Sequence, residues 1–183
     1  DVGLQMPKGS TATLALEIHY NNLAGYTDAL DASGVEFCTT KKFRTNTASV
    51  HWFGTNSILV LPHQQQDVVA NCGPLNTGPV HVLAESPHMH QTGVHAKLVL
   101  NRKGGGQEII HDKPFAFSDQ QVYPVSLIVN PGDTFTTTCT YNNTTNNVVT
   151  FGPNTENEMC YNFVTAYPAG ALSGPMGNNH CLQ

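Results

Sequence analysis

Two histidines separated by a single residue are the first feature of this sequence that points to chemistry. His88 and His90 flank Met89 in the stretch Glu85–Gly93, ESPHMHQTG. Because successive side chains of a strand point to opposite faces, we expect His88 and His90 to share one face and Met89 to point to the other. Two imidazoles at this spacing can hold one metal ion. The same spacing also arises in ordinary surface strands, so the pair alone leaves both interpretations open.

Met159 is a second candidate ligand. It lies among acidic and polar residues at the start of a strand-like run, in NTENEMCYNF at residues 154–163, where a core-filling side chain is not obviously needed. A thioether combined with imidazoles favours copper, above all Cu(I), over zinc or calcium. Packing in the core is the alternative for any methionine, and distance along the chain does not decide between the two.

The chain has nine histidines, and four of them cluster between residues 81 and 95. Within this cluster, His81 and His95 are weaker candidates, as groups that support the ligands rather than as ligands. Four histidines elsewhere in the chain are expected to be solvated or hydrogen-bonded surface residues: His51, His63, His111 and His180.

Alternating apolar and polar residues place much of the chain in short strands. Residues 12–20, ATLALEIHY, alternate strictly and predict a half-buried strand whose polar face carries His19. Further strand-like runs are separated by turn residues such as NRKGGG and NPGD. These runs are VEFCTT, SILVL, DVVA, PVHVLAES, VHAKLVLN, QEIIH, VYPVSLIV, DTFTTTCTY, NVVTF and CYNFVTAYP. No helical period appears, so the sequence predicts an all-β fold, an antiparallel β-sandwich of the jelly-roll type.

Length and charge exclude several classes of protein. The 183 residues suffice for one sizeable domain. Charged residues make up 11% of the chain and the net charge is -5, which argues against a nucleic-acid-binding surface. No run of about 18 apolar residues is present that would span a bilayer, and DVGLQMPKGS at the start lacks the features of a signal peptide.

Cysteine and asparagine usage favours an oxidising compartment. The five cysteines form no C-x-x-C pair, which favours disulfides with one thiol left over. Two glycosylation sequons overlap, Asn142-Asn143-Thr144 and Asn143-Thr144-Thr145, and at most one is expected to carry a glycan. We therefore expect a secreted protein or one of the secretory-pathway lumen.

Four motifs in a fixed order resemble a known enzyme family. They are HYNN at 19–22, HMHQTG at 88–93, CTYNNTT at 139–145 and ENEMCYNFVTAYP at 156–168. This order resembles the ascorbate-dependent type II copper monooxygenases, the group that includes the peptidylglycine α-hydroxylating and dopamine β-monooxygenases. The resemblance extends over essentially the whole chain.

The resemblance implies a role for each candidate ligand. His88, His90 and Met159 match the residues that hold the copper at which oxygen and substrate react. His19 matches one ligand of a second, electron-transfer copper. In the family the other two ligands of that second copper come from an adjacent His-His pair, which this sequence does not contain.

The chain therefore resembles the C-terminal catalytic half of a two-domain enzyme. On this interpretation residues 1–20 are the last strand of, or the junction with, a missing N-terminal β-sandwich that carries the electron-transfer copper. Residues 21–183 are the C-terminal copper-binding catalytic β-sandwich. The resemblance also implies two disulfides and one free thiol: Cys72 with Cys181, Cys139 with Cys160, and Cys38 unpaired.

The implied reaction is the hydroxylation of an activated C–H bond by O2 with ascorbate as reductant. In the peptide-amidating branch an arginine two places before the His-x-His pair binds the peptide carboxylate, but Ser86 occupies that position here. We therefore expect a small organic substrate, with Ser86, Tyr161 and Asn162 as candidate lining residues and packing as the alternative for the aromatic ones, including Tyr167. Two other hypotheses stay open: a secreted copper-binding β-sandwich module without turnover on its own, and a structural sandwich that binds nothing.

Overall fold

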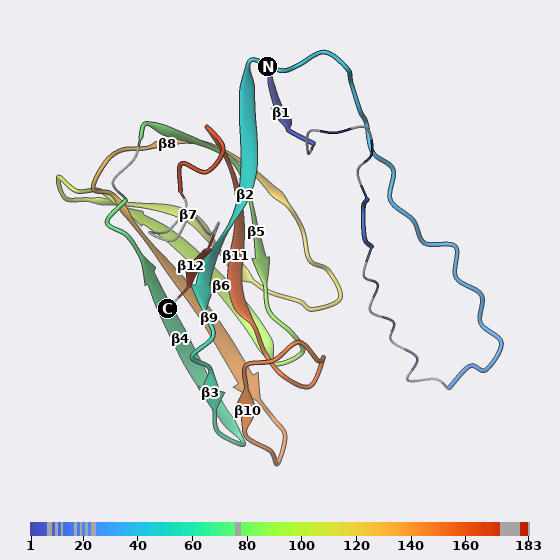
Figure 1. The fold of residues 1–183 in the computed structure, drawn as a ribbon. Helices are drawn as coiled ribbons and strands as arrows, with labels where there is room; N and C mark the ends of the chain where they lie inside the picture. The colour runs from blue at the N-terminus through green and yellow to red at the C-terminus, as the bar shows by residue number, and fades with distance from the viewer. Residues whose placement is uncertain are drawn as a thin grey trace.

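Two β-sheets packed face to face form the body of the protein, and the chain between the first two strands includes a long extended segment at residues 25–45 (Figure 1). The computed structural model describes residues 1–6, 9, 11, 13–16, 18, 20, 22, 25–75, 78–172 and 180–182, the last three as backbone alone. No helix occurs in this part of the chain. Consequently, no helix of the described residues is long and apolar enough to cross a membrane.

The chain crosses repeatedly between the two sheets. The first sheet has the order β1-β2-β11-β5-β8, with β12 also pairing β2, and the second has the order β4-β9-β6-β7; β10 and β3 form a short separate pair. The strands are β1 (Val2–Leu4), β2 (Asn46–Thr55), β3 (Leu59–Val60), β4 (Gln64–Cys72), β5 (Val80–His88), β6 (Gly93–Asn101), β7 (Gln107–Pro114), β8 (Tyr123–Val129), β9 (Thr134–Asn143), β10 (Val149–Thr150), β11 (Cys160–Tyr167) and β12 (His180–Leu182). The all-β sandwich prediction is confirmed, although β1 and β12 pair with β2 in parallel.

The main core lies between the two sheets. Phe53 of β2 and Phe135 of β9 are fully buried, and their ring centroids are 4.7 Å apart across the sandwich. Val82, Leu98 and Val164 belong to the same buried cluster. Each such side chain contributes about 1.5–3 kcal/mol by leaving water. Burial of the apolar residues that face inward therefore stabilises the packing of the two sheets.

One disulfide joins the two sheets. Cys139 of β9 and Cys160 of β11 are bonded, with Cα atoms 5.8 Å apart, which confirms this pairing. Cys72 is also disulfide-bonded; its expected partner Cys181 lies on β12, where side chains are outside the described residues. Cys38 is exposed and is the free cysteine of the described chain.

The prediction of strands in the N-terminal quarter is wrong. Leu14, Leu16 and Tyr20 are 58%, 57% and 66% exposed, and the described residues of 12–20 belong to no strand. The run VEFCTT at 35–40 is likewise exposed and irregular. A strand with one apolar face needs neighbouring strands and a second layer to bury that face, and no strand of the described chain pairs with this segment.

Candidate metal centre

A bulge in β5 turns the first histidine of the pair outward. Val80 and Val82 point into the core, but the pairing of β5 with β8 shifts between Val82 and Ala84. After the shift Glu85 is buried instead, so His88 lies on the outer face of the first sheet, opposite Tyr161 of β11. A β-bulge re-aims the side chains that follow it, and without this one the alternation of Val80 and Val82 would carry His88 into the core.

The residue between the two histidines anchors the turn that follows β5. Met89 is 0% exposed and packs in a second core cluster that includes the disulfide cysteines. At Gly93 an added Cβ would lie 2.6 Å from the Met89 Cβ, so only glycine fits there. The prediction that Met89 points away from the two histidines is confirmed.

The two imidazoles are in contact and each has a fixed orientation. Their ring centroids are 5.3 Å apart with the planes 87° to one another. The Nδ1 atom of His88 is 2.7 Å from Gln120 Oε1, and Nδ1 of His90 is 3.0 Å from the carbonyl oxygen of Asn157. Phe117 lies edge-on to His90, with centroids 5.9 Å apart.

These contacts select one tautomer for both rings. A carbonyl oxygen only accepts, so the proton of each neutral ring lies on Nδ1, and Nε2 carries the lone pair. The Oε1 assignment of Gln120 is supported by its other amide atom, Nε2, which donates to the Phe117 carbonyl. Hydrogen bonds of this kind on the far nitrogen orient histidine ligands in metal sites. The sequence did not reveal Gln120, which lies in the loop between β7 and β8.

Glu158 ties the histidine turn to the methionine segment. This carboxylate is 0% exposed, and it accepts from the backbone N–H of His90 at 2.6 Å, 68 residues away. Its other oxygen accepts from the backbone N–H and the hydroxyl of Thr92, at 2.7 and 2.8 Å. Hydrogen bonds to a charged group are stronger than those between neutral groups. Sequence reasoning treated Glu158 only as a polar neighbour of Met159.

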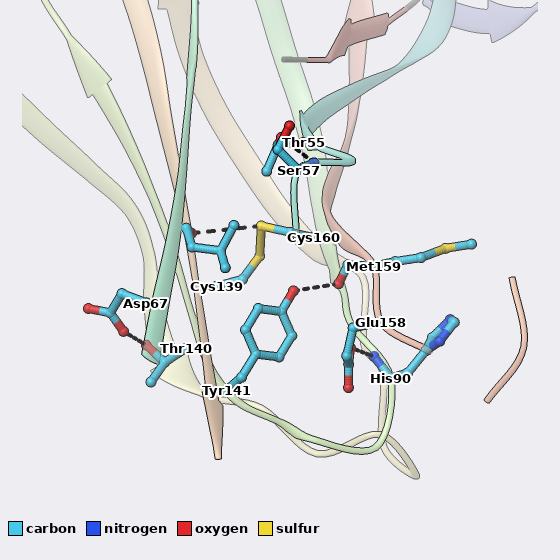
Figure 2. The surroundings of a disulfide bond; sticks show 11 residues. Thr55, Ser57, Asp67, His90, Cys139, Thr140, Tyr141, Glu158, Met159 and Cys160 are labelled. Carbon is cyan, nitrogen blue, oxygen red and sulfur yellow. Dashed lines mark hydrogen bonds between the residues drawn. A yellow bond between two sulfur atoms is a disulfide. The ribbon is translucent and has the colours of Figure 1, made fainter. Parts of the chain in front are cut away.

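Met159 is the residue directly after Glu158. Tyr161 pairs with His88 at the end of the antiparallel pairing of β11 with β5, and Met159 and His90 each lie two residues beyond this pair in the sequence. In Figure 2 the Met159 side chain and the His90 ring both extend away from the disulfide, toward the same side. The Met159 side chain is half-buried.

Tyr141 fixes the backbone of Met159. Its hydroxyl donates to the Met159 carbonyl at 2.8 Å (Figure 2). Burial, and secondarily the Glu158 carboxylate, raises the pKa of Tyr141 well above its usual value. The phenol therefore keeps the proton that this hydrogen bond needs.

The donors available here suit a soft metal. Within the described residues no three His, Cys, Asp or Glu side chains are arranged to hold a metal ion. Met159 directly follows Glu158, whose carboxylate is bound to the turn of His90, so its thioether is a further candidate donor at this end of the sheet. Two imidazoles and a thioether match the preference of Cu(I).

The outer face beside His88 is aromatic. Phe163 lies opposite both Ser86 of β5 and Trp52 of β2, and its ring centroid is 5.4 Å from that of His88. Tyr161 is next to Trp52 on the same face, at 5.7 Å. Burial raises the pKa of Tyr161. The three strands β2, β5 and β11 contain no lysine or arginine.

Two of the three candidate substrate residues share this face. Ser86 and Tyr161 lie on it, and the Ser86 hydroxyl donates to the Gln121 carbonyl at 3.0 Å. Asn162 instead points between the sheets, is 1% exposed, and donates to Glu85 Oε2 at 2.8 Å. The structure therefore does not bring Asn162 to the face that carries His88.

Two of the other histidines make contacts away from the pair. His81, at the far end of β5, stacks on Tyr167 with centroids 4.6 Å apart. A hollow of about 480 Å³ lies beside this stack, but the guanidinium of Arg102 within it is already bound to Glu108 and Asp133. His95 on β6 contacts Asp112 at 3.2 Å.

Two histidines expected at the surface are buried. His51 is 0% exposed, with Nε2 2.8 Å from Ser49 Oγ, and His111 is 3% exposed, with Nδ1 2.7 Å from Glu85 Oε1. The prediction of a surface position is wrong for these two, because each occupies an inward strand position, where a polar partner binds its imidazole. His63 is exposed as expected. His19 and the side chain of His180 lie outside the described residues.

Comparison with known proteins identifies the family of this chain. The family described as copper type II ascorbate-dependent monooxygenase, C-terminal domain, matches residues 46–182. Dopamine beta-hydroxylase from Equus caballus is 30% identical over 179 residues, which cover 90% of this chain and 29% of that protein. The human dopamine beta-hydroxylase is 30% identical over 178 residues, 90% of this chain and 29% of that protein.

A tyramine beta-hydroxylase from Caenorhabditis briggsae is also 30% identical, over 181 residues that make up 90% of this chain and 30% of that protein. The chain thus spans less than a third of the length of these relatives. The match of the family model covers every strand of both β-sheets except β1, and it includes His88, His90 and Met159 but not His19. The chain belongs to the copper type II ascorbate-dependent monooxygenases and corresponds to their C-terminal domain.

Proposed function

We propose that this chain is the oxygen-activating domain of an ascorbate-dependent copper monooxygenase, with copper held by His88, His90 and Met159. The observation that carries the proposal is the paired orientation of the two imidazoles, whose Nδ1 protons are bound by Gln120 and Asn157. Copper bound there would supply one-electron chemistry toward O2, which protein side chains lack. The reaction would convert a C–H group of a small organic substrate to C–OH.

The residues around the centre perform separate tasks in this proposal. Gln120 and the Asn157 carbonyl hold the imidazole protons, and Glu158 holds the His90 turn against the segment of Met159. Met89, packed in the core, anchors the turn to the sandwich. A soft thioether as third ligand favours the reduced metal, and three protein ligands leave a position open.

The outer aromatic face supports an uncharged substrate. Trp52 and Phe163, with centroids 5.3 Å apart, offer flat apolar surface beside His88. Ser86 stands where the peptide-amidating branch has its arginine, and the absence of lysine and arginine from β2, β5 and β11 leaves a substrate carboxylate without a cationic partner on these strands. Tyr161 and Ser86 are the candidate contacts on this face.

The proposal extends to a partner and a location. A second, electron-transfer copper would have His19 as one ligand and the remaining ligands in an N-terminal domain. The interior disulfide between Cys139 and Cys160 supports a secretory or extracellular location, where such bonds persist. A glycan on one of the sequons belongs to the same expectation.

X-ray absorption of the Cu(I)-loaded chain tests the ligand set. We expect one sulfur scatterer and two imidazoles, with loss of the sulfur in Met159→Leu. Met89→Leu is the matched control, because Met89 is buried in the core and its sulfur should not contribute. A sulfur signal that survives Met159→Leu contradicts the ligand assignment, and failure to retain copper after dialysis against a mild chelator supports a purely structural sandwich.

Oxygen consumption with ascorbate separates the enzyme from a copper-binding module without turnover. We expect consumption coupled to substrate hydroxylation when the chain is joined to an N-terminal domain of the family, and little with the chain alone. Copper binding with intact ligands but no coupled turnover in the joined protein would favour the binding module.

A further inference from the structure

Two overlapping sequons lie at the end of β9, and the fold gives their asparagines opposite surroundings. Asn143 is 0% exposed, whereas Asn142 is exposed. Neighbouring strand residues point to opposite faces, so the Asn143 amide points between the sheets and the Asn142 amide points to solvent. The two sequons are equivalent in sequence, but their asparagines differ in burial.

The amide group of Asn143 is fully engaged in hydrogen bonds. Its Nδ2 donates to the carbonyls of Val60, Leu61 and Asn147 at 3.2, 3.1 and 2.8 Å. Its Oδ1 accepts from the backbone N–H and the hydroxyl of Thr145 at 3.0 and 2.7 Å. A sugar on Nδ2 would replace one of the two amide hydrogens and would need space that this side chain does not have. Asn143 can therefore carry a glycan only if this turn fails to form.

Asn142 has the surroundings that a glycan needs. Its backbone N–H donates to the Thr92 carbonyl at 2.8 Å, and it pairs with Gln65 of β4, so its backbone is fixed. Among the described residues its side-chain amide makes no hydrogen bond, and Thr144 of the same sequon is also exposed. The Asn142 side chain points to solvent from the outer face of the second sheet, whereas His88 lies on the outer face of the first.

We propose that Asn142 is an N-glycosylation site and that Asn143 stays unmodified in the folded protein; this rests on the proposed secretory location. In the transfer, Nδ2 of Asn142 forms a C–N bond to the anomeric carbon of an oligosaccharide carried on a lipid diphosphate. The carbon–oxygen bond to the diphosphate breaks, the lipid diphosphate leaves, and the amide gives up one proton. Because transfer precedes folding, chains modified at Asn143 would be retained as misfolded, and the secreted protein would show Asn142 alone.

Site mapping on the full chain secreted from eukaryotic cells tests the proposal. Enzymatic removal of the glycan in heavy-oxygen water converts the carrier asparagine to labelled aspartate, which tandem mass spectrometry locates. We expect the label at Asn142. A label at Asn143, or at neither residue of the secreted protein, would overturn the proposal.

Two threonine variants provide matched controls that leave both asparagines in place. Thr144→Ala removes only the first sequon and should abolish the glycan. Thr145→Ala removes only the second and should leave the glycan, although it also loses a hydrogen bond to Asn143. If Thr145→Ala is not secreted, the wild-type mapping still decides. Copper binding of the deglycosylated protein is measured separately, so failure of the glycan proposal and failure of the copper proposal give different results.

Discussion

Two buried carboxylates, Glu85 and Glu158, are held in contrasting ways. Glu85 is 1% exposed, and it is bound by two side chains: His111 Nδ1 at 2.7 Å and Asn162 Nδ2 at 2.8 Å. Glu158 is 0% exposed and accepts from two backbone N–H groups and one hydroxyl of the turn at residues 90–92. Side-chain donors can turn to suit a new partner, whereas backbone donors cannot. The Glu85 cluster should therefore adapt when an amide replaces the carboxylate and both partners remain, whereas the hydrogen bonds of Glu158 to residues 90–92, here called the Glu158 clamp, should not.

Removing His111 should have the largest effect on stability. His111→Ala leaves Glu85 buried without its closest partner, and removing one member of a buried pair costs about 3–5 kcal/mol. We expect a loss of this size in the free energy of unfolding, measured with urea. Copper stoichiometry of the protein that remains folded should not change, because His111 lies between the sheets. A loss below about 1 kcal/mol would show that the cluster reorganises even without its histidine.

Glu158→Gln should come next, with an effect on both stability and copper. A glutamine has one acceptor oxygen, so in either orientation its NH2 group faces a backbone N–H of His90 or Thr92. We expect a loss of about 3 kcal/mol in unfolding free energy, since each hydrogen bond to a charged group is worth about 1.5–3 kcal/mol. Cu(I) affinity, measured by competition with a chelator, should fall as the His90 turn separates from Met159.

Glu156→Gln is the matched control for this variant. Glu156 is exposed and lies two residues away in the same segment, so its substitution should change stability by no more than about 0.5 kcal/mol. Equal effects of the two substitutions would mean that net charge, rather than the clamp, governs this end of the sandwich.

Gln120→Ala should weaken copper binding without a comparable loss of stability. Gln120 is exposed, and its Oε1 fixes the Nδ1 proton of His88. Loss of such a partner typically weakens metal binding about 10–100-fold. Gln120→Glu keeps an acceptor and should restore much of the affinity. Gln121→Ala is the control, because its side chain contacts Asp119 and its carbonyl, which serves Ser86, is retained. An equal loss in Gln121→Ala would assign the effect to the loop as a whole.

The sequence predicted the parts of the fold in which alternation matches burial. The strands of both sheets have one face on the core, so their apolar residues alternate and their existence could be read directly. Residues 12–20 alternate equally well but have no sheet beside them in the described chain, and Leu14 is 58% exposed. Local pattern cannot report the absence of a neighbouring strand.

The candidate site was predictable only in its donors. His88, His90 and Met159 are visible by residue type and spacing. Their supports are not, because the bulge in β5, Gln120 and the Glu158 clamp depend on contacts between residues far apart in sequence. On β7 the hydropathy pattern even points the wrong way, since Ile109 is 62% exposed while His111 is buried. A bulge between β6 and β7, where Leu98 pairs with His111 and Val99 with Ile109, puts these two residues on opposite faces, and Glu85 on the facing sheet gives the buried imidazole a partner.

The smallest effect is expected for Glu85→Gln. With its oxygen toward His111, the new glutamine presents NH2 to Asn162, whose amide can rotate by half a turn. Asn162 Oδ1, a buried atom without a hydrogen-bond partner in the structure, would then accept from this NH2. The number of hydrogen bonds stays the same, so we expect a change within about 1 kcal/mol in the free energy of unfolding, and unchanged Cu(I) affinity. A loss of about 3 kcal/mol or more would show instead that Glu85 and His111 form an ion pair. The glutamine variant keeps the hydrogen bonds and removes only the charge of residue 85, so a loss of that size would have to come from the charge.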